Sequence, residues 1–225
     1  MSAFTYTAPT ISLEERQAER EALSDSERMQ LEYDLYGPTD EKRLDDVNIN
    51  LAVESFQESV ESILKKEEYL RAKAAVPELV EQESPAIALL KATNWQAADA
   101  AKRLVDYWKL RVRVFGEERA FLPMSVDGAI RDDLEHLRKA FVFQLDYDKT
   151  GRAVVFFDRV RCIPEVAPRE SFPRCLFFVL QCLVKQKSLW DLGFVVIVNM
   201  RVSFECHIIM LSRHQLTFLF SLAAD

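Results

Sequence analysis

The stretch from Ala140 to Cys162 constrains the fold of this chain more than any other. Two runs rich in β-branched and aromatic residues, Phe141–Leu145 and Val154–Val160, flank the four residues Asp148–Gly151. Because Gly151 can adopt the positive φ that a tight hairpin loop needs, the pattern predicts a β-hairpin. The preceding sequence is mostly helical in pattern, so the hairpin marks the start of an α/β layer.

Charge separates an acidic leader from a neutral body. Residues 1–46 carry twelve acidic and five basic side chains, which accounts for the net charge of −7 over 225 residues. We expect this leader to be largely disordered, apart from a short helix. No stripe of interleaved basic and aromatic residues indicates a nucleic-acid partner. The N-terminus lacks the basic and apolar segments of a secretory signal, and we expect a cytoplasmic protein.

Helical periodicity dominates the sequence before the hairpin. Ser24 and Glu27 have the spacing of a capping box, which predicts a short helix that ends at Gly37-Pro38. Apolar residues at intervals of three and four predict further helices over residues 50–75, 85–94, 96–115 and 127–139.

The helix predicted over residues 96–115 is the most clearly amphipathic one. Its apolar residues step by three and four from Ala97 to Phe115, and Gly116 ends it. The other face is charged and is expected to be a solvated helix surface. That face carries Lys102, Arg103, Asp106, Lys109, Arg111 and Arg113.

Beyond the hairpin, the order of helix and strand predicts a βαβ unit. The predicted helix at 170–187 is apolar almost all round, so it must be covered on both sides or line a cavity that holds an apolar ligand. Gly193 precedes FVVIVNM, which is typical of a parallel strand buried on both faces. Strand, helix and strand over residues 153–200 predict a right-handed crossover and an α/β fold.

Side chains with catalytic or metal-binding chemistry do not converge. The sequence has no glycine-rich phosphate loop, no GxSxG and no HExxH motif. Cys206, His207 and His214 are close in sequence but match no common zinc pattern. The four cysteines, at positions 162, 175, 182 and 206, lack CxxC spacing and indicate buried, reduced thiols. We therefore predict no enzyme, no cofactor and no metal site.

Several segments in this order resemble the CRAL-TRIO lipid-binding family of phosphatidylinositol-transfer and tocopherol- or retinal-binding type proteins. Ile87–Trp95 is similar to the family's apolar-Leu-Arg-Ala-Arg-Lys-Phe segment, and the helix ending at Gly116 is similar to the family's next helix. Asp148–Val154, with the sequence DKTGRAV, resembles the family's D-x-x-G-R-P-V motif. The apolar helix at 170–187 and the strand Phe194–Met200 resemble the elements that follow in the family.

The chain departs from the family pattern at four positions within these segments. Lys91 stands where the family often has arginine near the inositol phosphate, and Thr93 replaces the second basic residue. These two differences leave phosphoinositide selectivity open. Ala153 replaces a common proline and Asn199 a frequent aspartate, which leaves the fold expectation unchanged.

The resemblance implies an α/β protein in four parts. These are the acidic leader with a short helix (1–46), an N-terminal helical region (47–120), a partial CRAL-TRIO lipid-binding domain (121–201) and an apolar tail (202–225). The tail matches nothing in the family. We expect it to be a replaced or aberrant C-terminus, with a genuine divergent ending as the alternative.

The function that the resemblance implies is non-covalent binding of a phosphoinositide, another phospholipid or an isoprenoid, with transfer between membranes. The implied partners are that lipid and, transiently, a membrane surface that the protein contacts peripherally. The residues implied to contact the lipid are Lys91, near the head group, and Phe143, Phe156, Phe178, Cys182, Val196 and Val198. The alternative is a truncated chain that binds no lipid and acts as a helical module for a protein partner.

Overall fold

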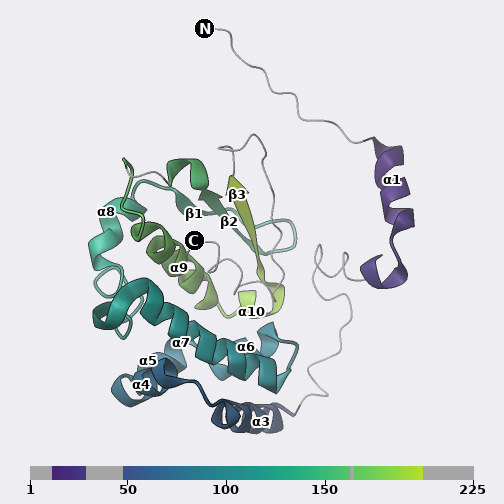
Figure 1. Ribbon diagram of the computed structural model, residues 1–225. Coiled ribbons are helices and arrows are strands. Elements are labelled where there is room, and N and C mark those ends of the chain that lie inside the picture. Colours follow the sequence, from purple (N-terminus) through teal and green to yellow (C-terminus); the bar gives the residue numbers. More distant parts are fainter. Residues whose placement is uncertain (1–11, 29–47, 163–164, 200–225) are drawn as a thin grey trace. The chain divides into compact units, whose positions relative to one another are not determined.

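A computed structural model describes residues 12–28, 48–162 and 165–199 (Figure 1). The chain divides into two compact units, Met1–Asp40 and Glu41–Asp225. The first unit contains α1 (Leu13–Ala22), which the sequence pattern did not predict although Ser12 and Glu15 have capping-box spacing. The Ser12 hydroxyl accepts the N–H of Glu15 at 3.1 Å, and the Glu15 carboxylate accepts the N–H of Ser12 at 2.8 Å.

The predicted capping box at Ser24 is confirmed. The Ser24 N–H donates to the Glu27 carboxylate at 2.9 Å, the Glu27 N–H donates to the Ser24 hydroxyl at 3.3 Å, and residues 25–28 are helical. Gly37 and Pro38, the predicted end of this helix, lie outside the described residues.

The second unit begins with α3 (Ile49–Ser62), α4 (Glu67–Ala75), α5 (Pro77–Glu83) and α6 (Ala86–Ala92). The single helix predicted over residues 50–75 is therefore wrong. The chain breaks after α3, where the Lys66 ammonium donates to the carbonyls of Val60 and Glu61 at 2.6 and 2.7 Å. Pro77 begins α5, because the first position of a helix needs no N–H donor.

The longest of the described helices, α7 (Ala97–Arg119), organises this unit. Gly116 has a φ of 71° and interrupts it, so the amphipathic part ends where predicted and one further turn continues to Arg119. The apolar face is buried against α3, α4 and α6, with Trp108 fully enclosed. The prediction that Arg111 lies on the solvated face of this helix is wrong, because its side chain is 0% exposed.

The helix predicted over residues 127–139 is right only in part. The structure has a 3-10 turn, η2 (Arg131–Asp133), followed by the short helix α8 (Leu134–Leu137). Before them the chain folds back on itself, and the N–H of Ala129 donates to the Pro123 carbonyl at 2.9 Å. A Cβ at Gly128 would collide with this carbonyl, so the turn requires glycine.

The predicted hairpin and βαβ unit are both confirmed. Strand β1 (Val142–Leu145) pairs antiparallel with β2 (Ala153–Asp158), and Gly151 in the loop has a φ of 85°. After the 3-10 turn η3 (Arg159–Arg161), α9 (Ser171–Val184) and the short α10 (Leu189–Leu192) lead to β3 (Phe194–Asn199). Strand β3 pairs parallel with β2, and the strand order is β1-β2-β3. The fold is therefore of the general α/β class.

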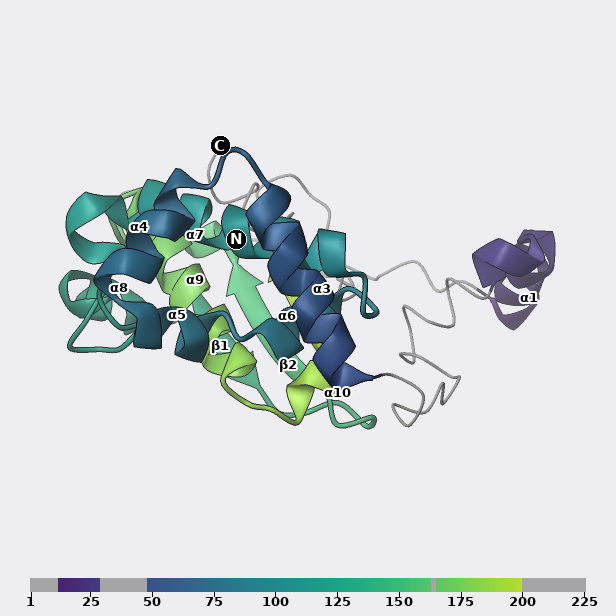
Figure 2. The same ribbon diagram turned by 90° about the horizontal axis from the view of Figure 1, so that it is seen from below.

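Helix α9 lies between the sheet and α7, with α3 and α4 packed on the far side of α7 (Figures 1 and 2). The ring of Phe177 on α9 lies 5.4 Å from the rings of both Tyr107 and Phe115 on α7, measured between centroids. The sequence predicted either cover on both sides of this apolar helix or a cavity along it; the sheet and α7 cover it on two sides, and Leu180 and Val184 also line a pocket. None of the helices that the structure describes is long and apolar enough to cross a membrane.

The two faces of the sheet differ in how they are covered. Alternate residues of β2 and β3, including Val155 and Val196, are buried on the α9 side. On the other face Phe143 and Leu145 remain 37% and 40% exposed. Strand β3 is therefore buried on one face and half-buried on the other, where burial on both faces was predicted.

Candidate ligand-binding site

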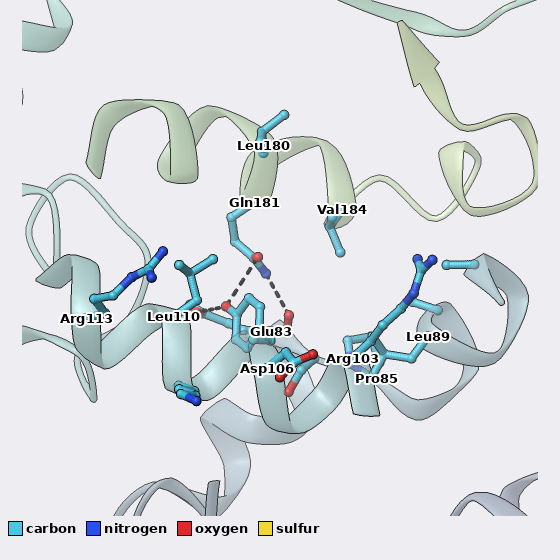
Figure 3. Close-up of a pocket in the computed structure, with 15 residues that line it drawn as sticks. Glu83, Pro85, Leu89, Arg103, Asp106, Leu110, Arg113, Leu180, Gln181 and Val184 are labelled. Atoms are coloured by element: carbon cyan, nitrogen blue, oxygen red, sulfur yellow. Dashed lines mark hydrogen bonds between the residues drawn. The ribbon is translucent and has the colours of Figure 1, made fainter. Parts of the chain in front are cut away.

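A pocket of about 370 Å³ lies between α6, α7 and α9 (Figure 3). Each helix contributes residues spaced three or four apart, because such residues share one face of a helix. Hydrocarbon makes up most of the walls. The aliphatic side chains that line the pocket include Pro85, Ala88, Leu89, Ala92, Leu110, Leu180 and Val184.

A fully buried ion pair supports the inner wall of the pocket. Glu83, at the end of α5, and Arg111, on α7, pair directly and are 2% and 0% exposed. Glu83 also accepts the backbone N–H of Met124 at 2.6 Å, while Arg111 donates to the Leu122 carbonyl. The guanidinium carbon of Arg111 lies 4.9 Å from the centre of the Trp108 ring, a cation–π contact. Both charges are thus compensated inside the protein.

Tyr107 and Gln181 join this ion pair to α9. The Tyr107 hydroxyl accepts from Arg111 at 2.9 Å and lies 3.3 Å from the Gln181 side-chain oxygen. The Gln181 amide donates to the backbone carbonyl of Glu83 at 2.8 Å (Figure 3). Burial raises the pKa of Tyr107 above its usual range, so its phenol stays protonated at neutral pH. The inner wall therefore presents neutral groups that already have partners.

The rim of the pocket is cationic. Arg103, Lys109 and Arg113 all line it from α7, and among the described residues Asp106 is the one carboxylate at the rim. Lys109 and Arg113 are exposed, and neither side chain makes an ion pair or hydrogen bond within residues 12–28, 48–162 and 165–199. Arg103 is half-buried, and burial lowers its pKa while Asp99 opposes that shift. A ligand at the rim thus meets a positive potential above apolar walls.

The structure places four of the predicted lipid contacts on opposite faces of the sheet. Val196 and Val198 are buried beneath α9, at 0% and 3% exposure, so a ligand reaches them only if α9 moves. Phe143 and Phe156 form a tilted ring pair on the other face, with centroids 5.5 Å apart. The sheet therefore separates two pairs that were expected to contact one ligand.

The remaining predicted contacts lie on helices, and none of them is part of the pocket lining. Phe178 and Cys182 are half-buried, one turn apart on α9, and Lys91 is half-buried on α6 beside the lining residue Ala92. Burial raises the pKa of the Cys182 thiol, which keeps it protonated. Thr93 is buried and its hydroxyl donates to carbonyls at the end of α6, so it serves to cap that helix.

The three thiols that the structure describes are free, as predicted; Cys175 is buried, but Cys162 and Cys182 are only half-buried, where burial was predicted. Burial raises the pKa of Cys175 to about 12 and that of Cys162 to about 11. These values keep both groups as unreactive thiols near neutral pH. Cys206, His207 and His214 lie outside the described residues.

The sequence pattern missed the pocket because α7 was assigned one apolar face and one solvated face. A second apolar stripe runs through the charged face, where Tyr107, Leu110 and Val114 follow one another at intervals of three and four. This spacing of apolar residues in the sequence could have indicated that the charged face is partly covered by another element. Two of its residues, Tyr107 and Leu110, line the pocket together with Leu180 and Val184 on α9, which is far away in the sequence.

No protein-family model, curated protein or solved structure matches this chain. The chemistry of the pocket must therefore be inferred from its own residues. Its walls can hold hydrocarbon, the buried charges behind its inner wall are paired with each other, and its rim carries cations. This combination suits a molecule with an apolar body and a polar head.

Proposed function

We propose that the protein binds an amphipathic lipid in the pocket between α6, α7 and α9, without making or breaking a covalent bond. The observation that carries the proposal is the joining of hydrocarbon walls to a cationic rim in one pocket. Its volume of about 370 Å³ is within the range of roughly 300–1,000 Å³ that ligand pockets occupy. Each buried methylene contributes about 0.8 kcal/mol, so the chain supplies affinity and the rim supplies selectivity.

The resemblance of residues 87–200 to the CRAL-TRIO family supports a lipid as the ligand. On this proposal, residues 121–201 belong to a CRAL-TRIO-like domain, and Asp148–Val154 form its entry loop. Release and capture of the lipid at a membrane surface would make the protein a carrier between membranes. We place the ligand in the pocket and not on the open sheet face with Phe143 and Phe156, because the pocket combines apolar walls with the cations Arg103, Lys109 and Arg113 in its lining.

A variant that fills the pocket tests this placement. We expect the wild type to bind a fluorescent fatty-acyl probe saturably. Ala88→Phe puts a large ring on the α6 wall, which displaces several methylenes of the bound acyl chain and weakens binding. Loss of two methylenes alone would weaken binding roughly tenfold. The matched control is Ala74→Phe, at an exposed position on α4.

Both variants are compared by probe titration, with circular dichroism to verify folding. Weak binding by Ala88→Phe with unchanged binding by Ala74→Phe supports the pocket. Equal affinity of the wild type and Ala88→Phe contradicts it. An unaltered protein that binds no probe and yields no lipid on extraction contradicts lipid binding altogether.

A further inference from the structure

We infer that the pocket selects an anionic amphiphile with a single acyl chain, and that Lys109 and Arg113 hold its head group. This inference rests on the proposed function and adds the charge of the ligand, its number of chains and its orientation. The head group can be a carboxylate or a phosphate monoester, because both present anionic oxygens to ammonium and guanidinium donors.

The first argument is the charge of the rim. Lys109 and Arg113 are four residues apart on α7, so their side chains lie on neighbouring turns of one face. Like charges at this spacing destabilise a helix, and an anion between them would relieve the repulsion. Of the described residues, the lining holds three further charged side chains, Asp106, Arg103 and the internally paired Glu83. The rim therefore keeps a net positive charge that favours an anion.

The second argument is the direction in which a ligand can lie. Figure 3 shows Gln181 and Val184 pointing from α9 toward α7, with Arg113 at one end of the α7 row and Arg103 at the other. The polar groups in between, Tyr107 and Gln181, already bond to each other and to Glu83. A charged head group gains nothing there, so it stays at the rim while the chain follows Leu110 and Val184.

The third argument is size. The pocket volume of about 370 Å³ lies near the lower end of the range of roughly 300–1,000 Å³ for ligand pockets. A two-chain phospholipid carries twice the hydrocarbon of its one-chain counterpart and would leave much of it in water. The free energy of burying hydrocarbon is then gained for one acyl chain only, so the pocket should favour a fatty acid or a lysophospholipid over a two-chain lipid.

The test compares ligands that share one chain and differ in the head group. Palmitate, palmityl alcohol and palmityl-trimethylammonium are titrated against the full chain by displacement of a fluorescent fatty-acyl probe. We expect palmitate to bind about tenfold more tightly than the alcohol, and added salt to narrow that difference. Lysophosphatidate should bind more tightly than phosphatidate with the same acyl chain.

A double variant assigns the effect to the two rim cations. Lys109→Gln/Arg113→Gln should weaken palmitate binding about tenfold and leave the binding of the alcohol unchanged. The control is Lys65→Gln/Lys73→Gln, which removes the same charge from exposed positions in the Ile63–Lys66 loop and on α4, outside the pocket lining. It should change neither the affinity for palmitate nor that for the alcohol.

Three outcomes overturn the inference. They are equal affinity for palmitate and the alcohol, equal loss in both double variants, and preference for the two-chain lipid. In each of these cases lipid binding itself persists, so the proposed function stands. Failure of all ligands to displace the probe contradicts the proposed function instead.

Discussion

The inner wall and the rim of the same pocket differ in how their charged side chains are placed: those at the wall are buried and paired, and those at the rim are exposed. At the wall, Glu83 and Arg111 are sealed from water and form an ion pair, whereas at the rim Lys109 and Arg113 are exposed and lack ion-pair partners in the described parts of the chain. Buried charges must be paired to be tolerated, but exposed ones need not be. The comparison therefore assigns the wall to stability and the rim to ligand selection.

Removing one member of the buried pair should have the largest effect on stability. Glu83→Ala leaves Arg111 charged and uncompensated in the interior, and we expect the free energy of unfolding to fall by about 3–5 kcal/mol. Urea titration followed by circular dichroism measures the change. Glu81→Ala, at an exposed position on the same helix, is the control and should stay within about 0.5 kcal/mol of the wild type.

Replacing both residues distinguishes the destabilisation caused by an unpaired buried charge from the stability that the ion pair itself contributes. In Glu83→Leu/Arg111→Met no buried charge remains, and apolar replacements of similar size are often neutral. We expect this double variant to be more stable than Glu83→Ala by about 2 kcal/mol or more. A double variant as unstable as the single one would mean that the pair itself supplies the stability.

The hydroxyl of Tyr107 should contribute less than the ion pair. Tyr107→Phe keeps the ring contacts with Trp108 and Phe177 but removes the acceptor that Arg111 uses. We expect a loss of about 1–2 kcal/mol, because one hydrogen bond to a charged group disappears. Thermal unfolding of the variant measures it, and an unchanged midpoint would show that water replaces the hydroxyl.

Asp148 in the hairpin loop is a paired charge near the surface, intermediate between the wall and the rim. Burial raises its pKa, but bonds from the Thr150 hydroxyl and from the backbone and side chain of Arg152 outweigh this and lower it to about 2. The unfolded value is about 3.9. The carboxylate thus stabilises the fold above pH 4, and that contribution is lost as pH falls toward 2.

The size of this acid effect should be on the order of 1 kcal/mol, since solvent screens a partly exposed group. Urea titrations of the wild type and of Asp148→Asn at several pH values measure it. The difference in stability between them should shrink between pH 4 and pH 2. A difference that does not depend on pH would show that the loop bonds do not need the charge.

The rim should have the smallest effect on stability. We expect Lys109→Gln/Arg113→Gln to change the free energy of unfolding by less than about 0.5 kcal/mol, because both side chains are exposed and unpaired within the described residues. The same urea titration measures it. A loss comparable to that of Glu83→Ala would place these cations in the structural network and remove the contrast between wall and rim.

Local chemistry made much of the fold predictable. The Asp148–Gly151 loop, the stop at Gly116 and the capping box at Ser24 each depend on neighbouring residues, and each was found where predicted. The βαβ order also followed from the sequence, because a long apolar helix before an apolar strand has few other arrangements. Where the prediction failed inside helices, as at Ile63–Lys66, contacts of Lys66 with the preceding turn decided the break.

The candidate site was less predictable because its partners are distant in the sequence. Arg111 belongs to a charged helix face by spacing alone, and its burial depends on Glu83 and on the Leu122–Met124 segment. Likewise, the cover of Tyr107 and Leu110 comes from α9, more than sixty positions later. Periodicity gives the face of a helix but not what packs against it.

The location of bound lipid tests the central claim most directly. The purified full chain is irradiated with a palmitate analogue that carries a photoreactive diazirine on its chain, and labelled peptides are identified by mass spectrometry. The account predicts labels on the pocket walls, at Leu110, Leu180 or Val184, that are strongly reduced in Ala88→Phe. Labels confined to Phe143 and Phe156 on the open sheet face, or unchanged by Ala88→Phe, would contradict it.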